Sequence, residues 1–202
     1  GTLDTTFGTG GKVITNSSTL TFPYISSASA SAVAIQSDGK IVVAGYAYNS
    51  NQHANSANLN QYDFVLARFN TDGTLDATFG SGGIAVTAVG EGSDFDYAYA
   101  VAIQADGKIV AAGSTGPNAG TTDNFALVRY NTNGTLDTSF GAGGIVTADI
   151  GTNNDKAYAV AIQSDGKIVA TGYSYKGDYA DFALARYNTN GTLDSTFGSG
   201  GM

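Results

Sequence analysis

The sequence predicts an all-β protein built as a β-propeller-type repeat array, and three observations carry this prediction. The octapeptide that opens the chain, 1–8, returns almost unchanged at 73–80, 134–141 and 191–198, at spacings of 72, 61 and 57 residues. The intervals contain strand-like runs and no segment with the 3.6-residue period of a helix. Four-stranded meanders repeated at this spacing are typical of propellers, whereas the rungs of a β-solenoid, the alternative, are usually shorter.

Each repeat reads as four short strands with local connections. An Ala-Val-Ala-Ile-Gln run forms the first strand, and an Asp-Gly turn follows because Asp-Gly supplies the positive φ of a tight hairpin. An Ile-Val run returns, a Phe-x-Leu-x-Arg run forms the third strand, and a Gly-rich Leu-Asp-x-x-Phe-Gly-x-Gly-Gly segment leads into the fourth. Strands are expected at 158–163, 168–173 and 182–187 in the last copy, and at 84–89 and 145–150 after the Gly-rich segments.

These elements assemble into one repeat domain over 1–202, with three four-stranded antiparallel blades. The repeats span about 12–83, 84–144 and 145–201, preceded by a partial motif at 1–11. The ends are complementary, because a strand at 12–15 would complete a blade before the first and the last blade lacks its outer strand. Propellers close with about four to eight blades. Three readings follow: an excerpt of a longer array, a head-to-tail oligomer that closes, or a filament.

The connections divide between two faces. In an antiparallel meander the first-to-second and third-to-fourth connections share one face, and these are nearly invariant here. The other connections differ in length and content, so they form a variable face on a rigid scaffold, where binding usually occurs. The variable loops are expected at 16–30, 47–62, 90–97, 114–123, 151–156 and 174–180.

Composition narrows the class of protein. Charged residues make up only 13% of the 202 residues, and there are 28 glycines and no cysteine. This profile is typical of a β-rich extracellular protein. The net charge of −8 argues against a nucleic-acid partner, whose phosphates need a basic surface. No run of 18 apolar residues is present, so membrane insertion is not expected.

The repeated motifs resemble the delta-60 repeat, a β-propeller repeat of bacterial secreted and surface proteins. The resemblance rests on Ala-Val-x-x-x-x-Asp-Gly-Lys-Ile-Val followed by Phe-x-Leu-x-Arg-[Phe/Tyr]-Asn-x-[Asp/Asn]-Gly-x-Leu-Asp-x-x-Phe-Gly-x-Gly-Gly, and it covers nearly the whole chain. It implies a propeller fold and an extracellular or cell-surface location in a bacterium. It implies no established activity.

The turn after the third strand is a candidate calcium site. Asn70, Asp72 and Asp76 place oxygen side chains at positions one, three and seven around a glycine, as in a short calcium loop. The alternative is an Asx-type turn that needs Asn or Asp and Gly for its backbone geometry. The equivalent residues are Asn131, Asn133, Asp137, Asn188, Asn190 and Asp194.

The only arginines, Arg68, Arg129 and Arg186, occupy the same place in each repeat. We expect each to bind the carboxylate of its Leu-Asp turn bidentately and to lock the third strand to that turn. An anion site on the propeller axis is the alternative. The lysines that follow the Asp-Gly turns, Lys40, Lys108 and Lys167, are likewise interpreted as structural.

Unrepeated residues near the variable face are the candidates for ligand binding. Tyrosine rings there could stack on sugars or anchor a protein partner. Asp94 and Asp96 are the only unrepeated carboxylate pair, and paired carboxylates can hydrolyse glycosides. The single histidine, His53, lies in a polar loop and is interpreted as solvated. The candidate ligand residues are Tyr48, Tyr62, Asp94, Asp96, Tyr97, Tyr175 and Tyr179.

Together these features predict a non-enzymatic extracellular scaffold, structural or adhesive, which assembles with itself through its open ends and presents variable loops. A glycan or a surface protein is the expected further partner. A carbohydrate-binding, lectin-like module is the first alternative, and a glycoside-acting enzyme using Asp94 and Asp96 is the second.

Overall fold

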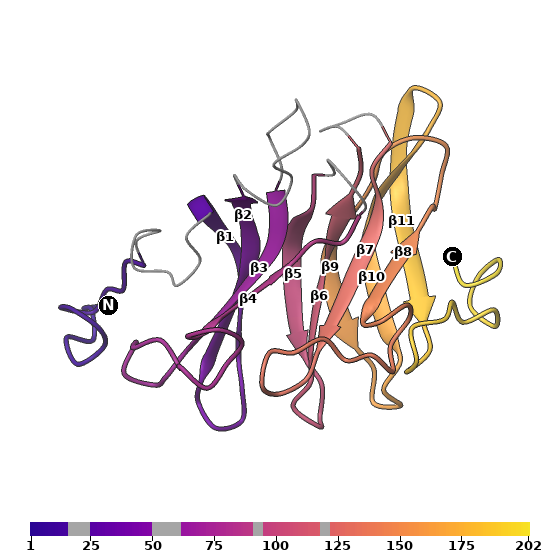
Figure 1. Ribbon diagram of the computed structural model, residues 1–202. Coiled ribbons are helices and arrows are strands. Elements are labelled where there is room, and N and C mark those ends of the chain that lie inside the picture. Colours follow the sequence, from indigo (N-terminus) through magenta and orange to yellow (C-terminus); the bar gives the residue numbers. More distant parts are fainter. Residues whose placement is uncertain (16–24, 50–61, 91–94, 118–121) are drawn as a thin grey trace.

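A computed structural model describes residues 1–15, 25–49, 62–90, 95–117 and 122–202 (Figure 1). Within these ranges the chain forms strands and turns but no helix, so the all-β prediction is confirmed. Accordingly, this described part contains no helix long and apolar enough to cross a membrane. The strands are β1 (Ile25–Ile35), β2 (Ile41–Asn49), β3 (Tyr62–Phe69), β4 (Ile84–Thr87), β5 (Tyr97–Ile103), β6 (Ile109–Thr115), β7 (Asn124–Tyr130), β8 (Ile145–Ala148), β9 (Asp155–Ile162), β10 (Ile168–Lys176) and β11 (Tyr179–Tyr187).

The strands form three antiparallel meander sheets that stand side by side (Figure 1). The first sheet has the order β1-β2-β3-β4, the second β5-β6-β7-β8, and the third β9-β10-β11. The third sheet has three strands, as expected from the outer strand that the last blade lacks. The expected strand at 12–15 is not formed, and an isolated bridge joins Gly8 to Lys12. A strand needs a hydrogen-bonded neighbour, and residues 12–15 pair with no strand of the described chain.

The sheets are offset from the repeats of the sequence. Each outer strand pairs with the third strand that precedes it, so Ala85 of β4 lies opposite Leu66 of β3. The first sheet thus extends beyond the repeat boundary at 83. Some strands also reach into expected loops: β1 begins at Ile25, and β10 and β11 leave only Gly177 and Asp178 as a turn between them.

The core lies between neighbouring sheets. Large side chains of one sheet pack against mostly smaller ones of the next, as Phe64 and Leu66 do against Ala111 and Val128. The same arrangement recurs between the second and third sheets, where the large side chains are Phe125 and Leu127. Alternation of large and small residues lets two sheets interdigitate about 10 Å apart.

A repeated joint connects the Gly-rich segment of one sheet to the turn of the next. The Gly80 N–H donates to the Asn133 carbonyl at 2.8 Å, and the Phe79 ring lies over Gly134. A Cβ at Gly134 would lie 2.7 Å from the Gly80 nitrogen and 2.9 Å from the Phe79 ring, so only glycine permits this approach. The equivalent hydrogen bonds run from Gly8 to Asp72 and from Gly141 to Asn190, each 2.8 Å long.

The connections occupy opposite ends of the sheets. The β1–β2 and β5–β6 turns lie at one end, and the β8–β9 and β10–β11 connections lie at the other (Figure 1). The first end carries the invariant turns and is called the constant face below. The second carries the connections that differ between repeats and is called the variable face.

We predict that Gly134→Ala destabilises the fold by roughly 2–4 kcal/mol, because it adds both an unfavourable positive φ and a clash with the joint. Gly143→Ala is the matched control, since Gly143 also has a positive φ but nothing within 4 Å of its Cβ position. Its cost should be about 1 kcal/mol. Equal losses in urea denaturation of the two variants would show that the close approach contributes nothing.

Candidate functional site

A charge cluster fixes each Gly-rich segment to its own sheet on the constant face. Arg68 Nε donates to Asp76 Oδ2 at 2.7 Å, and Lys40 Nζ donates to the same oxygen at 2.8 Å. Asp76 Oδ1 accepts from the Thr78 hydroxyl at 2.7 Å, and the guanidinium carbon lies 4.6 Å from the centre of the Phe79 ring. The expected pair is thus present, but through one N–H rather than a bidentate fork.

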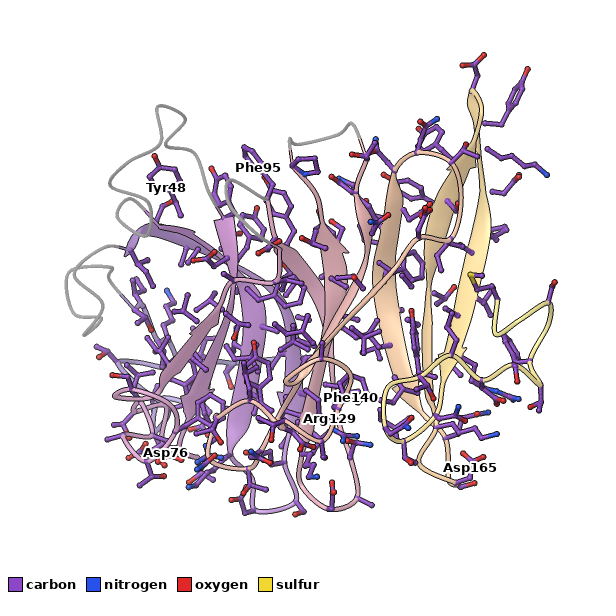
Figure 2. The ribbon with its side chains drawn as sticks, turned by 45° about the vertical axis from the view of Figure 1, so that its right-hand side comes forward. Tyr48, Asp76, Phe95, Arg129, Phe140 and Asp165 are labelled. Atoms are coloured by element: carbon purple, nitrogen blue, oxygen red, sulfur yellow. The ribbon has the colours of Figure 1, made fainter. Side chains whose placement is uncertain are left out.

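The remaining guanidinium nitrogens explain the difference. Arg68 Nη1 donates to the carbonyl of Thr132 in the next sheet, and Arg129 Nη1 donates to that of Thr189. Each of these arginines therefore binds its own carboxylate and the neighbouring sheet at once. Figure 2 shows Arg129 beside Phe140 at this end of the sheets. The cluster recurs as Arg129, Asp137 and Lys108, and as Arg186, Asp194 and Lys167.

These contacts determine the ionisation of the carboxylates. Burial raises the pKa of Asp137, but the hydrogen bonds from Lys108 and Ser139 and the charge of Arg129 together lower it by more. The net pKa of Asp137 therefore lies well below its ordinary value of 3.8. The pKa of Asp76 is lowered by the equivalent contacts. In the third sheet the hydrogen bond from Lys167 is the largest cause of the lowered pKa of Asp194.

The same geometry removes the oxygens proposed for calcium. Asp76 is engaged by two cations, and Asp72 Oδ1 accepts from the backbone and hydroxyl of Thr74 at 2.9 and 2.7 Å. The Asn70 side chain donates to the Thr74 hydroxyl. These contacts are those of an Asx-type turn, the alternative to a calcium site. Among the residues that the structure describes, no group of three Asp, Glu, His or Cys side chains could hold a metal.

A row of aromatic rings crosses all three sheets near the variable face. Ring centres are 5.6 Å apart for Tyr48 and Tyr62, 5.3 Å for Tyr62 and Tyr97, and 6.1 Å for Tyr97 and Tyr99. The series continues into the third sheet with Tyr99 and Tyr158 at 4.9 Å. We call this the tyrosine row, and its members are Tyr46, Tyr48, Tyr62, Phe95, Tyr97, Tyr99, Tyr158, Tyr173 and Tyr175.

The row is partly accessible and uncharged. Tyr158 is 50% exposed, and the other rings are half-buried. Burial raises the pKa of Tyr97 and that of Tyr173 to about 12, so both phenols stay protonated at neutral pH. Figure 2 labels Tyr48 and Phe95 at this end of the molecule. The row brings Tyr48, Tyr62, Tyr97 and Tyr175 together from the predicted ligand set.

The other three predicted ligand residues, Tyr179, Asp94 and Asp96, are not part of this row. Tyr179 begins β11 beside the hairpin turn and is 78% exposed. Asp94 and His53 lie outside the described residues. Asp96 is only 1% exposed, so the structure contradicts its assignment as a ligand residue on the surface.

Asp96 holds a loop instead. Its Oδ2 accepts from the Val89 backbone N–H at 2.7 Å, and Asp155 accepts from Ile150 at 2.6 Å in the same way. The carboxylate is therefore repeated, since both residues stand four positions before an Ala-Val-Ala-Ile-Gln run, a match that the sequence analysis overlooked. Burial raises the pKa of Asp96 to about 6, although the hydrogen bond from the Val89 N–H lowers it.

The sequence analysis missed an ion pair between the second and third sheets. Lys156 Nζ lies 2.9 Å from Asp123 Oδ2, and Asp123 is fully buried. The Asp155 backbone N–H also donates to the Asp123 carbonyl at 2.6 Å. Neither Lys156 nor Asp123 belongs to a repeated motif, so no pattern in the sequence could have paired them.

Comparison with known families identifies the repeat. The model of the family described as "Domain of unknown function (DUF5122) beta-propeller" matches residues 36–79, 104–140 and 163–197, more than half of the chain. The chain belongs to the DUF5122 β-propeller family. Each match runs from the glutamine before the first turn to the phenylalanine of the joint, so the DUF5122 unit contains the whole charge cluster. No curated protein matches the chain.

The outer face of the third DUF5122 unit exposes side chains that are buried in the other two. Phe182 is 97% exposed, whereas Phe64 and Phe125 at the same position are fully buried. Leu184 is 43% exposed, and its counterparts are fully buried. We call this surface, formed by Phe182, Leu184 and Phe197, the trailing face.

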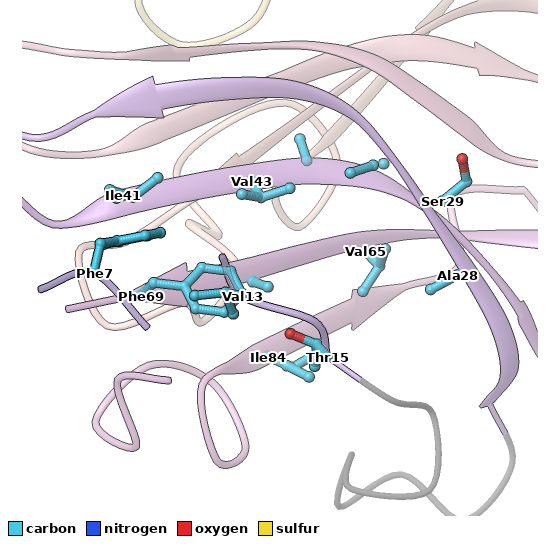
Figure 3. Close-up of a pocket in the computed structure, with 14 residues that line it drawn as sticks. Phe7, Val13, Thr15, Ala28, Ser29, Ile41, Val43, Val65, Phe69 and Ile84 are labelled. Atoms are coloured by element: carbon cyan, nitrogen blue, oxygen red, sulfur yellow. The ribbon is translucent and has the colours of Figure 1, made fainter. Parts of the chain in front are cut away.

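At the opposite end, the first DUF5122 unit carries an apolar groove of about 390 Å³ (Figure 3). Ile41, Val43, Val65 and Phe69 line it, and Phe7 covers one side. We call this surface the leading face. Its lining residues are the counterparts of Ile109, Ala111, Ala126 and Tyr130, which are buried against the first sheet.

We predict that Asp137→Asn destabilises the fold by about 3 kcal/mol at pH 7, because it leaves the buried Arg129 without its counter-charge. The lowered pKa means that Asp137 stabilises the fold above pH 3.8 and loses this contribution as the pH falls further. The variant should therefore lose less stability than the parent in acid. Denaturation midpoints measured across pH test this.

Asp165→Asn is the matched control, because Asp165 is an exposed carboxylate that accepts one backbone hydrogen bond. Its effect should be roughly 0.5 kcal/mol or less. Similar losses for the two variants would mean that the charge cluster does not support the fold.

Proposed function

We propose that this chain is a non-enzymatic structural or adhesive scaffold that joins end to end with a second copy of itself and presents its variable face. The exposure of Phe182 carries the proposal. A phenylalanine that is buried in two sheets and almost wholly exposed in the third indicates a surface built for another sheet of the same kind.

The two end faces are complementary. Inside the chain, the large side chains of one sheet pack on the smaller side chains of the next. The trailing face offers the large set and the leading face offers the small set with an open groove. Burying Phe182 would stabilise the contact by roughly 1.5–3 kcal/mol, and burying Leu184, which is 43% exposed, would add about half as much.

The setting that we propose is the exterior of a bacterium. Support comes from the resemblance to the delta-60 repeat, which we propose as the finer identity of these DUF5122 units, and from the low charged fraction of 13%. The proposal of a non-enzymatic role has its own support. The repeated carboxylates of the charge clusters bind Arg and Lys, and Asp96 holds a loop.

We expect the chain to associate reversibly in sedimentation velocity runs over a concentration series. Phe182→Asp should weaken this association by about a hundredfold, since it places a charge in an apolar contact. Tyr179→Asp is the matched control, an exposed aromatic on the same strand but outside the trailing face. A parent chain that stays monomeric at every concentration would refute end-to-end joining.

The tyrosine row favours carbohydrate binding as a second function. Half-buried neutral rings in series suit the faces of sugar rings, and their phenol groups can hydrogen-bond to hydroxyls. A glycan array should therefore show binding of an extended oligosaccharide, and Tyr158→Ala should weaken it by about tenfold. Tyr179→Ala, outside the row, should leave it unchanged. An array without signal, or equal effects of both variants, would remove this second function.

A further inference from the structure

The Gly-rich segment performs two tasks wherever it lies between two sheets. In the first unit, Asp76 binds Arg68 and Lys40 of its own sheet. A few residues later, Phe79 and Gly80 dock on the turn of the next sheet. A complete joint therefore needs the carboxylate on one sheet and the Phe-Gly pair on the other.

The first segment of the chain, residues 3–15, performs only the docking task. The Gly8 N–H donates to the Asp72 carbonyl at 2.8 Å, and the Phe7 ring lies over Gly73. Its carboxylate, Asp4, is exposed and accepts hydrogen bonds from Thr6. Within the described part of the chain, Asp4 forms no ion pair. The segment thus docks on the sheet that follows it in the chain, but its carboxylate is bound to no sheet.

The last segment, residues 193–202, performs only the carboxylate task. Asp194 binds Arg186 and Lys167 at 2.8 Å each. Phe197 and Gly198 dock on no further sheet of the described chain, and the third sheet has no outer strand. This segment is bound to the sheet that precedes it in the chain, but it docks on no following sheet of the described chain.

Two copies cannot form the joint simply by bringing these faces together, because each joint has one docking seat, which is the turn that receives the Phe-Gly pair. On the leading face this seat is the turn at Gly73, and Phe7 and Gly8 of the same copy already occupy it. Phe197 and Gly198 of the other copy would need the same seat. The competing segments have the same Leu-Asp-x-x-Phe-Gly-x-Gly-Gly sequence. One of them must leave before the joint can form.

We propose that the joint between two copies forms by segment exchange, in which residues 3–15 of one copy replace residues 193–202 on the third sheet of the other. This rests on the proposed end-to-end association. Asp4 takes the place of Asp194 on Arg186 and Lys167, while Phe7 and Gly8 keep their seat. A single segment then completes both halves of the joint, as in the interior of the chain.

The direction of exchange follows from the strand that each segment can supply. Residues 12–15 follow the first segment and correspond to β4 and β8. In the interior, Val86 lies opposite Val65 and Thr147 lies opposite Ala126. By the same register Ile14 lies opposite Ala183, so the third sheet gains its fourth strand and its open edge is paired.

Association constants of charge variants test the exchange. Asp4→Asn should weaken association by roughly tenfold, because a charge-assisted contact to Arg186 and Lys167 is lost. Asp194→Asn should strengthen association by a similar factor, since it loosens the segment that must leave. Asp38→Asn, an exposed carboxylate in a similar turn, is the control and should change nothing. If Asp4→Asn leaves the association constant unchanged, or if Asp194→Asn lowers it, the exchange is overturned.

A disulfide tests the register, since the chain has no cysteine of its own. Ile14→Cys mixed with Ala183→Cys should form a disulfide between copies under mild oxidation, read by mass spectrometry. Ile14→Cys mixed with Ala180→Cys, three positions along the same strand, should not. A monomeric parent chain overturns both proposals. Association without the disulfide and without the Asp4 effect overturns the exchange alone.

Discussion

The architecture depends on one carboxylate per repeat, held by an arginine and a lysine. The Gly-rich segment has few side chains of its own to pack, so its position is fixed by Asp76, Asp137 and Asp194. In the first two units the guanidinium also reaches a carbonyl of the next sheet. A local ion pair thereby sets the spacing between sheets, and the apolar interdigitation between them follows from that spacing.

Repetition in the sequence made the fold predictable. The predictions failed where a feature depends on contacts with another sheet, which the repeats do not encode. Three copies of each turn located the strands of the interior and paired Arg129 with Asp137 correctly. Context decided the rest. The segment at 12–15 has strand-like residues but no partner strand. The match of Asp96 with Asp155 was overlooked, although both stand four residues before an Ala-Val-Ala-Ile run. The predicted bidentate geometry was wrong because a second acceptor of Arg68, the Thr132 carbonyl, belongs to another sheet.

The candidate surfaces show the same division. The sequence indicated that tyrosines gather near the variable face, because they lie outside the repeated blocks. It could not show that Tyr99 and Tyr158 join rings of two sheets into one row, since that contact depends on how the sheets stack. The end faces could be recognised only by comparing exposures, because Phe125 and Phe182 both open a Phe-Ala-Leu-x-Arg-Tyr-Asn sequence and have opposite environments.

Among the described residues, the packing contacts between sheets join neighbours in sequence, which has a consequence for how the molecule loses structure. In such linear arrays, stability is close to a sum of unit and interface contributions. The middle sheet has two interfaces, and each outer sheet has one. Amide protons of β5–β8 should therefore exchange most slowly, and both ends should open well below the free energy of global unfolding. Local fraying of the outer units is thus built into the order of the sheets.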